Sequence, residues 1–111
     1  MMKFLGSLGK NMATKYDITY LPGANRNLLE IDEYLSQFYP STPAKFFSEL
    51  DKKIQLLKEQ PYMSPKYIHN EKYRRLIVGD YLLFYTVDDD NKEILVHRIL
   101  HGSQDITQHL K

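Results

Sequence analysis

Large apolar and polar residues alternate along this chain with two different periods, and these periods predict its elements. Residues 16–20 alternate as in a half-buried strand, which ends before Leu21-Pro22-Gly23. Two helical stretches follow, at about 24–38 and about 42–60, with apolar residues at i, i+3, i+7 and i+10. These stripes are Leu28, Ile31, Leu35 and Phe38 in the first stretch, and Phe47, Leu50, Ile54 and Leu57 in the second.

The link between the two stretches, Pro40-Ser41-Thr42-Pro43, predicts a helix end followed by a helix start. Thr42 is the expected N-cap, and Pro43 suits the first helical position because its fixed φ is already helical. Two helices joined by so short a link form an antiparallel hairpin. Both apolar stripes must then be buried, and a sheet formed by the rest of the chain is the one candidate to cover them.

Residues 73–87 and 93–102 predict three consecutive antiparallel strands rich in Val, Ile, Leu, Phe and Tyr. Gly79-Asp80 is a two-residue turn of type I′ or II′, because glycine adopts a positive φ without steric cost. The polar run Asp88-Asp89-Asp90-Asn91 makes the second turn, and we expect it to be solvated rather than a metal loop, since the Gly and the distant Glu of an EF-hand are missing. The segment is therefore a three-stranded meander.

The turn at Gly79-Asp80 fixes which residues of the first two meander strands share a face. We assign one set to the helix-facing core: Leu76, Val78, Tyr81, Leu83, Tyr85 and Val87. The other face then carries Tyr73, Arg75 and Thr86 beside exposed Ile77, Leu82 and Phe84. An open sheet face with an arginine among large apolar side chains is where a partner would bind. The predicted partner-binding residues are Tyr73, Ile77, Leu82, Phe84 and Arg98.

In the last strand, strict alternation places Leu95, His97, Ile99 and His101 on one face, and a β-bulge would exchange the faces. Arg75, His97 and His101 on one face could bind a scissile phosphate and move protons in RNA cleavage, since imidazole titrates near neutral pH. The alternative, which we favour, is that these three side chains cap strand edges and contact a partner protein. His69 and His109 are expected to be solvated.

Composition limits the class of protein. The 111 residues, 42% of them hydrophobic, suit a single domain, and the absence of cysteine excludes disulfides and cysteine-based sites. No run approaches the roughly 18 apolar residues that span a membrane, so we expect a cytoplasmic protein without membrane partners. Residues 1–14 are expected to be a loosely ordered extension, and residues 15–111 the folded domain. We expect no metal and no cofactor.

The helix hairpin, the meander and the ending Arg98-Ile99-Leu100-His101-Gly102 resemble the RelE/ParE superfamily of toxins from bacterial type II toxin–antitoxin modules, over about residues 15–109. The resemblance implies an α+β fold in which two antiparallel helices pack on a four-stranded, mainly antiparallel sheet. The implied element order is β-α-α-β-β-β, with the first strand beside the last and a possible short C-terminal helix. It also implies a cognate antitoxin as partner.

The superfamily has two branches with different targets. RelE-like members cleave messenger RNA on the ribosome, whereas ParE-like members poison DNA gyrase and lack the ribonuclease residues. The ending resembles the ParE type, but Ser103 and Gln104 replace the two basic residues that often follow it, which weakens phosphate contact. We therefore expect a ParE-like gyrase poison of a plasmid-stabilisation-like module. The alternatives are a ribosome-dependent endoribonuclease using Arg75, His97 and His101, and a degenerate non-toxic relative.

Overall fold

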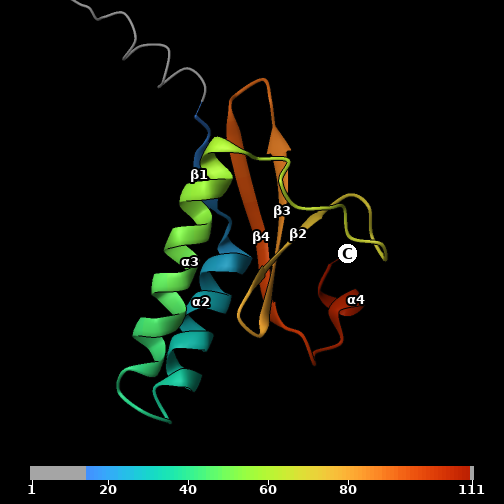
Figure 1. Ribbon diagram of the computed structural model, residues 1–111. Helices are drawn as coiled ribbons and strands as arrows, with labels where there is room; N and C mark the ends of the chain where they lie inside the picture. The colour runs from blue at the N-terminus through green and yellow to red at the C-terminus, as the bar shows by residue number, and fades with distance from the viewer. Residues whose placement is uncertain (1–14, 111) are drawn as a thin grey trace, which may run out of the picture.

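The computed structural model describes residues 15–110, which form a helix hairpin packed on a four-stranded sheet (Figure 1). Its elements, in chain order, are β1 Asp17–Tyr20, α2 Pro22–Leu35, α3 Thr42–Glu59, β2 Arg74–Val78, β3 Tyr81–Asp88, β4 Glu93–His101 and α4 Ile106–His109. The predicted α+β class and element order are confirmed, including the short C-terminal helix. The expected extension at residues 1–14 lies outside the described residues. No helix within residues 15–110 is long and apolar enough to cross a membrane.

The strand order in the sheet is β1-β4-β3-β2, with β1 beside β4 as the resemblance implied, and the structure shows that these two strands run parallel. The register of β2 and β3 is the predicted one, from Arg74 opposite Tyr85 to Val78 opposite Tyr81. Gly79 has a φ of +59°, and Lys92 is the one non-glycine residue with a positive φ in the described part of the chain. The turn therefore matches type II′, which requires a positive φ at its first central residue alone.

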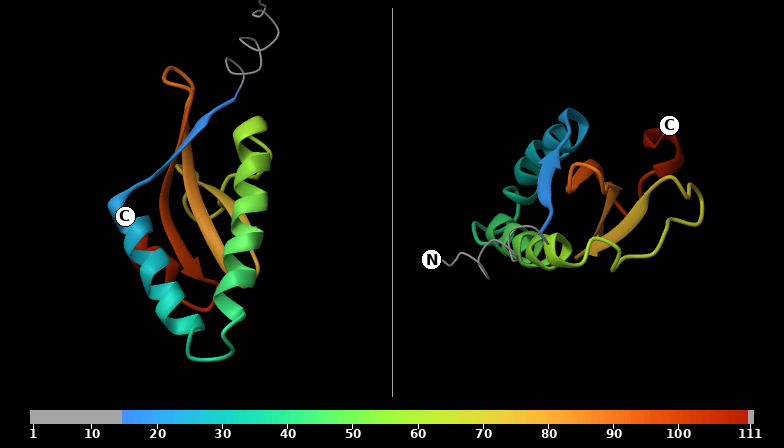
Figure 2. Two further views of the ribbon diagram at one scale, coloured as in Figure 1. Left: turned by 90° about the vertical axis from the view of Figure 1, so that its left-hand side faces the viewer. Right: turned by 90° about the horizontal axis from the view of Figure 1, so that it is seen from above.

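Helices α2 and α3 lie side by side and antiparallel, and together they cover one face of the sheet (Figure 2). Helix α2 ends at Leu35, three residues earlier than expected. The Ser36 hydroxyl donates to the Asp32 carbonyl (2.7 Å) at this end. Phe38 thus lies beyond the helix and is 56% exposed, so its place in the buried stripe was predicted wrongly. The α3 stripe is confirmed at Leu50, Ile54 and Leu57.

The first hydrophobic core lies between the hairpin and the sheet. Every predicted sheet residue of this face packs in it, with Val87 only partly buried. The buried side chains of this core that come from α3 and the two central strands include Phe46, Leu50, Ile54, Leu57, Leu83, Tyr85, Ile94, Val96 and Ile99. Tyr85 is fully buried, and its hydroxyl donates to the carbonyl of Pro61 (2.8 Å), which satisfies the polar end of its ring.

Strand β4 contains a β-bulge that the sequence pattern did not reveal. Phe84 lies opposite Arg98 and Tyr85 lies opposite Val96, so His97 is an extra residue without a partner in β3. Because one inserted residue reverses the alternation, Val96 before the bulge and Ile99 after it face the same core. The strict alternation predicted for this strand is therefore wrong.

The second face of the sheet is covered rather than open. The segment between α3 and β2 crosses this face together with α4 (Figure 2), and a second core forms there from Tyr67, Tyr73, Phe84, Leu100, Ile106 and Leu110. The Asn70 side chain donates to the Leu110 carbonyl (3.0 Å) and so joins the two covering segments. Phe84 is fully buried and Leu82 half-buried, so the prediction that both are exposed is wrong. The physical reason is the apolar pair on and beside α4, Ile106 and Leu110, which needs burial.

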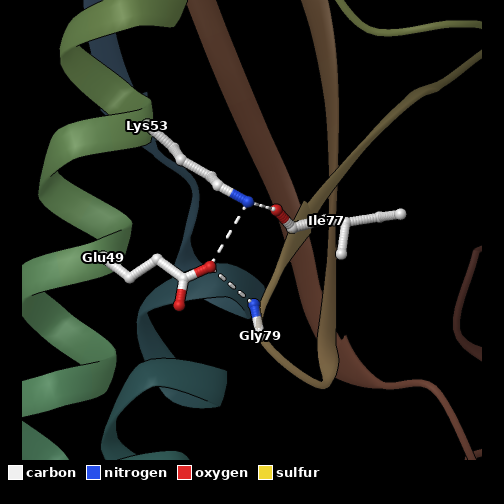
Figure 3. A network of polar contacts seen from close by, with 4 residues as sticks. All are labelled: Glu49, Lys53, Ile77 and Gly79. Atoms are coloured by element: carbon white, nitrogen blue, oxygen red, sulfur yellow. Dashed lines mark hydrogen bonds and ion pairs between the residues drawn. The ribbon is translucent and has the colours of Figure 1, made fainter.

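A polar network ties α3 to the edge strand β2 (Figure 3). The Gly79 N–H donates to Glu49 Oε2 (2.9 Å), and Lys53 Nζ donates to the Ile77 carbonyl (2.5 Å). Glu49 and Lys53 also form an ion pair at 3.3 Å. Two hydrogen bonds lower the pKa of Glu49. The one from Gly79 has the larger effect and the one from Lys53 the smaller. Lysine contacts of this kind occupy backbone groups of an edge strand that another chain could otherwise pair with.

The acidic turn between β3 and β4 has a structural role. Asp89 accepts hydrogen bonds from the hydroxyls of Tyr16 (2.6 Å) and Tyr62, which come from the two segments flanking β1 and α3. These two hydrogen bonds lower the pKa of Asp89, and the bond to Asp89 raises the pKa of Tyr16 to about 12. The turn thus joins three separate parts of the chain, whereas the sequence analysis predicted only a solvated turn.

The first core generates a stability prediction for α3. Ile54 is buried between the hairpin and the sheet, so Ile54→Ala should lower the free energy of unfolding by about 2–5 kcal/mol through lost burial and a cavity. Leu56→Ala is the matched control, because Leu56 lies two residues away on α3 and is 55% exposed. It should change stability by less than about 0.5 kcal/mol. Urea unfolding measures both, and equal effects would contradict the assigned stripe.

The Asp89 network generates a pH prediction. Because the folded pKa of Asp89 is lowered, its contribution to stability is present above the unfolded pKa of about 4 and is lost as the pH falls through the folded value. Asp89→Asn should therefore be less stable than the native chain at pH 7, and the difference should shrink at pH 3. Asp90→Asn, at the neighbouring exposed position, is the control. A difference independent of pH would contradict the ionic nature of these hydrogen bonds.

Candidate functional site

His97 lies on the second face of the sheet, where the bulge places it beside residues of β2 and β3. Its Nε2 is 2.9 Å from the Thr86 hydroxyl, and its ring packs edge-to-face on Tyr73 with centroids 5.0 Å apart. The side chain is half-buried, and this burial lowers its pKa, as do the nearby charges of Lys72 and Arg98. This lowered pKa favours the neutral imidazole, and one of its nitrogens is engaged by Thr86.

Arg75 lies on the same face, opposite Phe84. Its backbone N–H donates to the Pro65 carbonyl (3.1 Å), which fastens the covering segment to β2. The side-chain Nε is buried without a hydrogen-bond partner within residues 15–110. Because an unpaired buried N–H of a charged group costs free energy, this nitrogen lowers the stability of the fold.

His101 lies on the opposite, helix-facing side, since it pairs with core residue Tyr81. Its ring packs perpendicular to the Tyr81 ring, 5.2 Å between centroids. Nδ1 accepts the Ser103 N–H (3.1 Å) and lies 2.7 Å from the Ser103 hydroxyl, while Gln104 Oε1 accepts the His101 N–H (2.7 Å). The backbone bond makes Nδ1 an acceptor, which assigns the proton of the neutral ring to Nε2.

The three predicted catalytic residues therefore do not gather at one point. Arg75 and His97 share the second face, and the sheet separates both from His101. Ser103 and Gln104, at the positions where the resemblance implied basic residues, hold the His101 backbone and ring in place. The phosphate cluster predicted for the ribonuclease alternative is thus divided between two faces, and the cause is the bulge at His97.

The predicted partner-binding residues differ widely in their access to solvent. Ile77 is 48% exposed and Leu82 half-buried, whereas Tyr73 and Phe84 are 4% and 0% exposed. Two of the predicted residues are therefore closed to a partner by the second core. Ile77 is the member of the set with a large accessible apolar surface.

Arg98 connects the two ends of the domain. Its Nε donates to the His109 carbonyl (3.3 Å) and its Nη1 to the His97 carbonyl (3.2 Å). The guanidinium lies against Gly23 at the start of α2, where an added Cβ would come within 1.2 Å of Nη1. The absence of a side chain at Gly23 therefore leaves room for Arg98 to reach α4. The Arg98 guanidinium makes its contacts within the chain.

A cavity of about 320 Å³ opens on the helix side of the sheet, between α2, the ends of β3 and β4 and the turn after β4. Polar and aromatic side chains line it, namely Asn27, Glu30, Tyr34, Tyr81, His101 and Gln104. The sequence interpretation missed the residues from α2. Their spacing at i, i+3 and i+7 was the available signal, but a polar stripe beside an apolar one usually means a solvated surface.

Within residues 15–110, no group of three or more histidine, aspartate or glutamate side chains is arranged to hold a metal ion.

Comparison with solved structures shows that toxins of type II modules share this fold. A chain of the toxin–antitoxin complex RelBE2 from Mycobacterium tuberculosis matches with a TM-score of 0.57 at 20% identity, covering 78% of this chain and 98% of that one. The chromosomal ParDE system of P. aeruginosa matches with a TM-score of 0.66 at 15% identity, covering 79% and 97%. A free RelE mutant from E. coli matches with a TM-score of 0.60 at 14% identity, covering 86% and 93%.

Comparison of the sequence itself gives the family. A search of curated proteins finds no matching relative. The family model described as the ParE toxin of the type II toxin–antitoxin system parDE matches residues 18–106, which span β1 to the start of α4. The chain belongs to this ParE toxin family of the RelE/ParE superfamily.

Proposed function

We propose that this toxin poisons DNA gyrase by binding it, without chemistry of its own, and that a cognate antitoxin neutralises it. The observation that carries the proposal is the separation of His97 from His101 by the sheet. General acid–base cleavage of RNA needs groups within hydrogen-bond reach of one reacting phosphate. Two imidazoles on opposite faces do not meet that requirement.

The turn after β4 supports the same proposal. Ser103 and Gln104 contact His101 instead of adding positive charge. Arg98, the remaining base of the ending, is turned toward Gly23 and the His109 carbonyl. A protein-binding poison needs no such charge, whereas an enzyme that stabilises a phosphorane transition state depends on it.

A ribosome-dependent endoribonuclease is the second candidate, and one observation favours it. The buried Nε of Arg75 has no partner within the described residues, and neutral His97 lies on the same face. In that case the transition-state charge would fall mainly to Arg75, with His97 as the proton acceptor.

The antitoxin partner is proposed from the neighbouring structures, two of which come from toxin–antitoxin systems. Within residues 15–110, several of the exposed large apolar side chains lie on the helix hairpin, among them Leu29, which is 70% exposed, and Phe38, which is 56% exposed. A groove of about 480 Å³ runs beside Leu28, Leu29 and Phe47. A disordered antitoxin segment that folds on binding could bury these side chains through apolar anchors.

The two candidate activities are separated by assaying the full chain against both targets. We expect inhibition of gyrase-dependent supercoiling at toxin concentrations that leave ribosome-bound messenger RNA intact. If instead the chain cleaves that message, Arg75→Ala should lower the cleavage rate about 10²-fold or more, as loss of one preorganised donor does. Arg26→Ala, which changes an exposed arginine on α2, is the control. Cleavage that disappears in Arg75→Ala alone would overturn the proposal, and no activity in either assay would indicate a non-toxic relative.

The antitoxin surface is tested with the protein encoded by the neighbouring open reading frame. Leu29→Ser and Phe38→Ser should each weaken its binding about tenfold, because each removes roughly one apolar anchor. The loss should persist at high salt, since apolar contacts are not screened. Ile68→Ser, at a 78% exposed position between α3 and β2, is the control. Isothermal titration calorimetry measures all three, and equal affinities would place the antitoxin on another surface.

A further inference from the structure

The cavity beside α2 is built by three separate parts of the chain. Helix α2 contributes Asn27, Glu30 and Tyr34, which project to the same side because they are spaced at i, i+3 and i+7. The strand ends contribute Tyr81 and His101. Strand β1 ends at Tyr20, opposite Val96, so the later part of β4 has no strand beside it at this edge and the cavity occupies that space.

The charge of the cavity wall is negative. Among the described residues, Glu30 is the one aspartate or glutamate that lines the cavity, and no lysine or arginine lines it. Within residues 15–110 the one ion pair joins Lys53 and Glu49, which lie elsewhere. The contact made by the Glu30 carboxylate is a long one, 3.5 Å to the amide nitrogen of Asn27. The site therefore presents a carboxylate that a cation can pair with.

The other polar groups of the wall are already oriented. Asn27 Oδ1 accepts the Ile99 N–H (3.0 Å), which fixes the Asn27 amide and directs its nitrogen to Glu30. The N–H and C=O of one strand residue point to the same side, so the Ile99 carbonyl also faces this edge. An entering donor would thus find two oxygen acceptors, one charged and one neutral, beside the Tyr81 ring.

We propose that this cavity binds an arginine side chain of a partner protein. A guanidinium presents several N–H donors in one plane, which suits acceptors on two elements, and it packs favourably on aromatic rings. An ammonium group offers a more localised and more strongly hydrated charge. An anion would meet the Glu30 carboxylate without a compensating basic residue in the wall, so an acidic side chain is excluded by charge.

The partner that fits is the antitoxin, and in naming it the inference rests on the proposed function. Tyr34 borders the cavity and packs edge-to-face on Phe38, with centroids 5.2 Å apart. Phe38 is one of the apolar anchors proposed above for the antitoxin. The cavity is therefore continuous with that surface, and one segment could place an arginine in it while burying the aromatic pair.

The test uses the full chain and a small probe, so that it does not depend on the identity of the antitoxin. N-acetyl-arginine methylamide is titrated into ¹⁵N-labelled protein, with N-acetyl-citrulline methylamide as the uncharged analogue of the same shape. We expect saturable shifts of the Ser103 and Gln104 amide signals with the arginine probe only. Glu30→Gln should weaken this binding about tenfold or more, since it removes a charge-assisted contact.

Glu33→Gln is the matched control, because it makes the same change at an exposed position three residues along α2 that does not line the cavity. It should leave the affinity for the arginine probe unchanged. Equal binding of the citrulline probe, stronger binding of N-acetyl-glutamate methylamide, or an unaltered affinity in Glu30→Gln would each overturn the inference. Because the titration involves neither gyrase nor antitoxin, its failure is distinguishable from failure of the proposed function.

Discussion

The extra residue His97 in β4 is the constraint on which the arrangement of both cores depends. If the alternation of Ile94 and Val96 continued without interruption, Arg98 would enter the core beneath the helix hairpin. The bulge turns Arg98 away and brings Ile99 into that core instead, while Leu100 enters the second core. One residue without a partner in β3 thus keeps the Arg98 guanidinium out of the apolar core. A buried charge without a counter-charge would be very costly there.

The same bulge decides which chemistry the sheet can support. It places His97 in a half-buried position among Tyr73 and Thr86, where burial keeps the imidazole neutral. His101 is left on the other side, beside the hairpin. The cover formed by α4 and the segment before β2 then buries Phe84 and Tyr73, so the second face serves the stability of the domain more than contact with partners. Exposed apolar side chains such as Leu29 and Phe38 lie on the hairpin instead.

Local rules in the sequence were sufficient for some of these features and insufficient for others. The β2–β3 register followed from Gly79, because a two-residue turn leaves a single pairing. The hairpin stripes followed from helical periodicity, except at Phe38, where the helix ends early. The bulge could not be predicted, since no glycine or change of composition accompanies His97. The second core was also missed, because the residues that cover this face, Tyr67, Ile106 and Leu110, lie in short segments whose individual patterns are weak.

The cavity beside α2 shows why a site can be invisible to motif analysis. From the sequence, Asn27 and Glu30 are ordinary polar residues of a surface helix. In the fold they lie beside the edge of β4, because β1 ends at Tyr20 and leaves that edge open. In the sequence, Ser103 and Gln104 are notable only because the resemblance implied two basic residues at these positions. In the fold they hold His101 and complete the far wall of that cavity. Two basic residues at these positions would set positive charge opposite Glu30 and compete with any cation from outside. With Ser103 and Gln104 at these positions, the negative charge of the cavity is left uncompensated, which is the condition that recognition of an arginine requires.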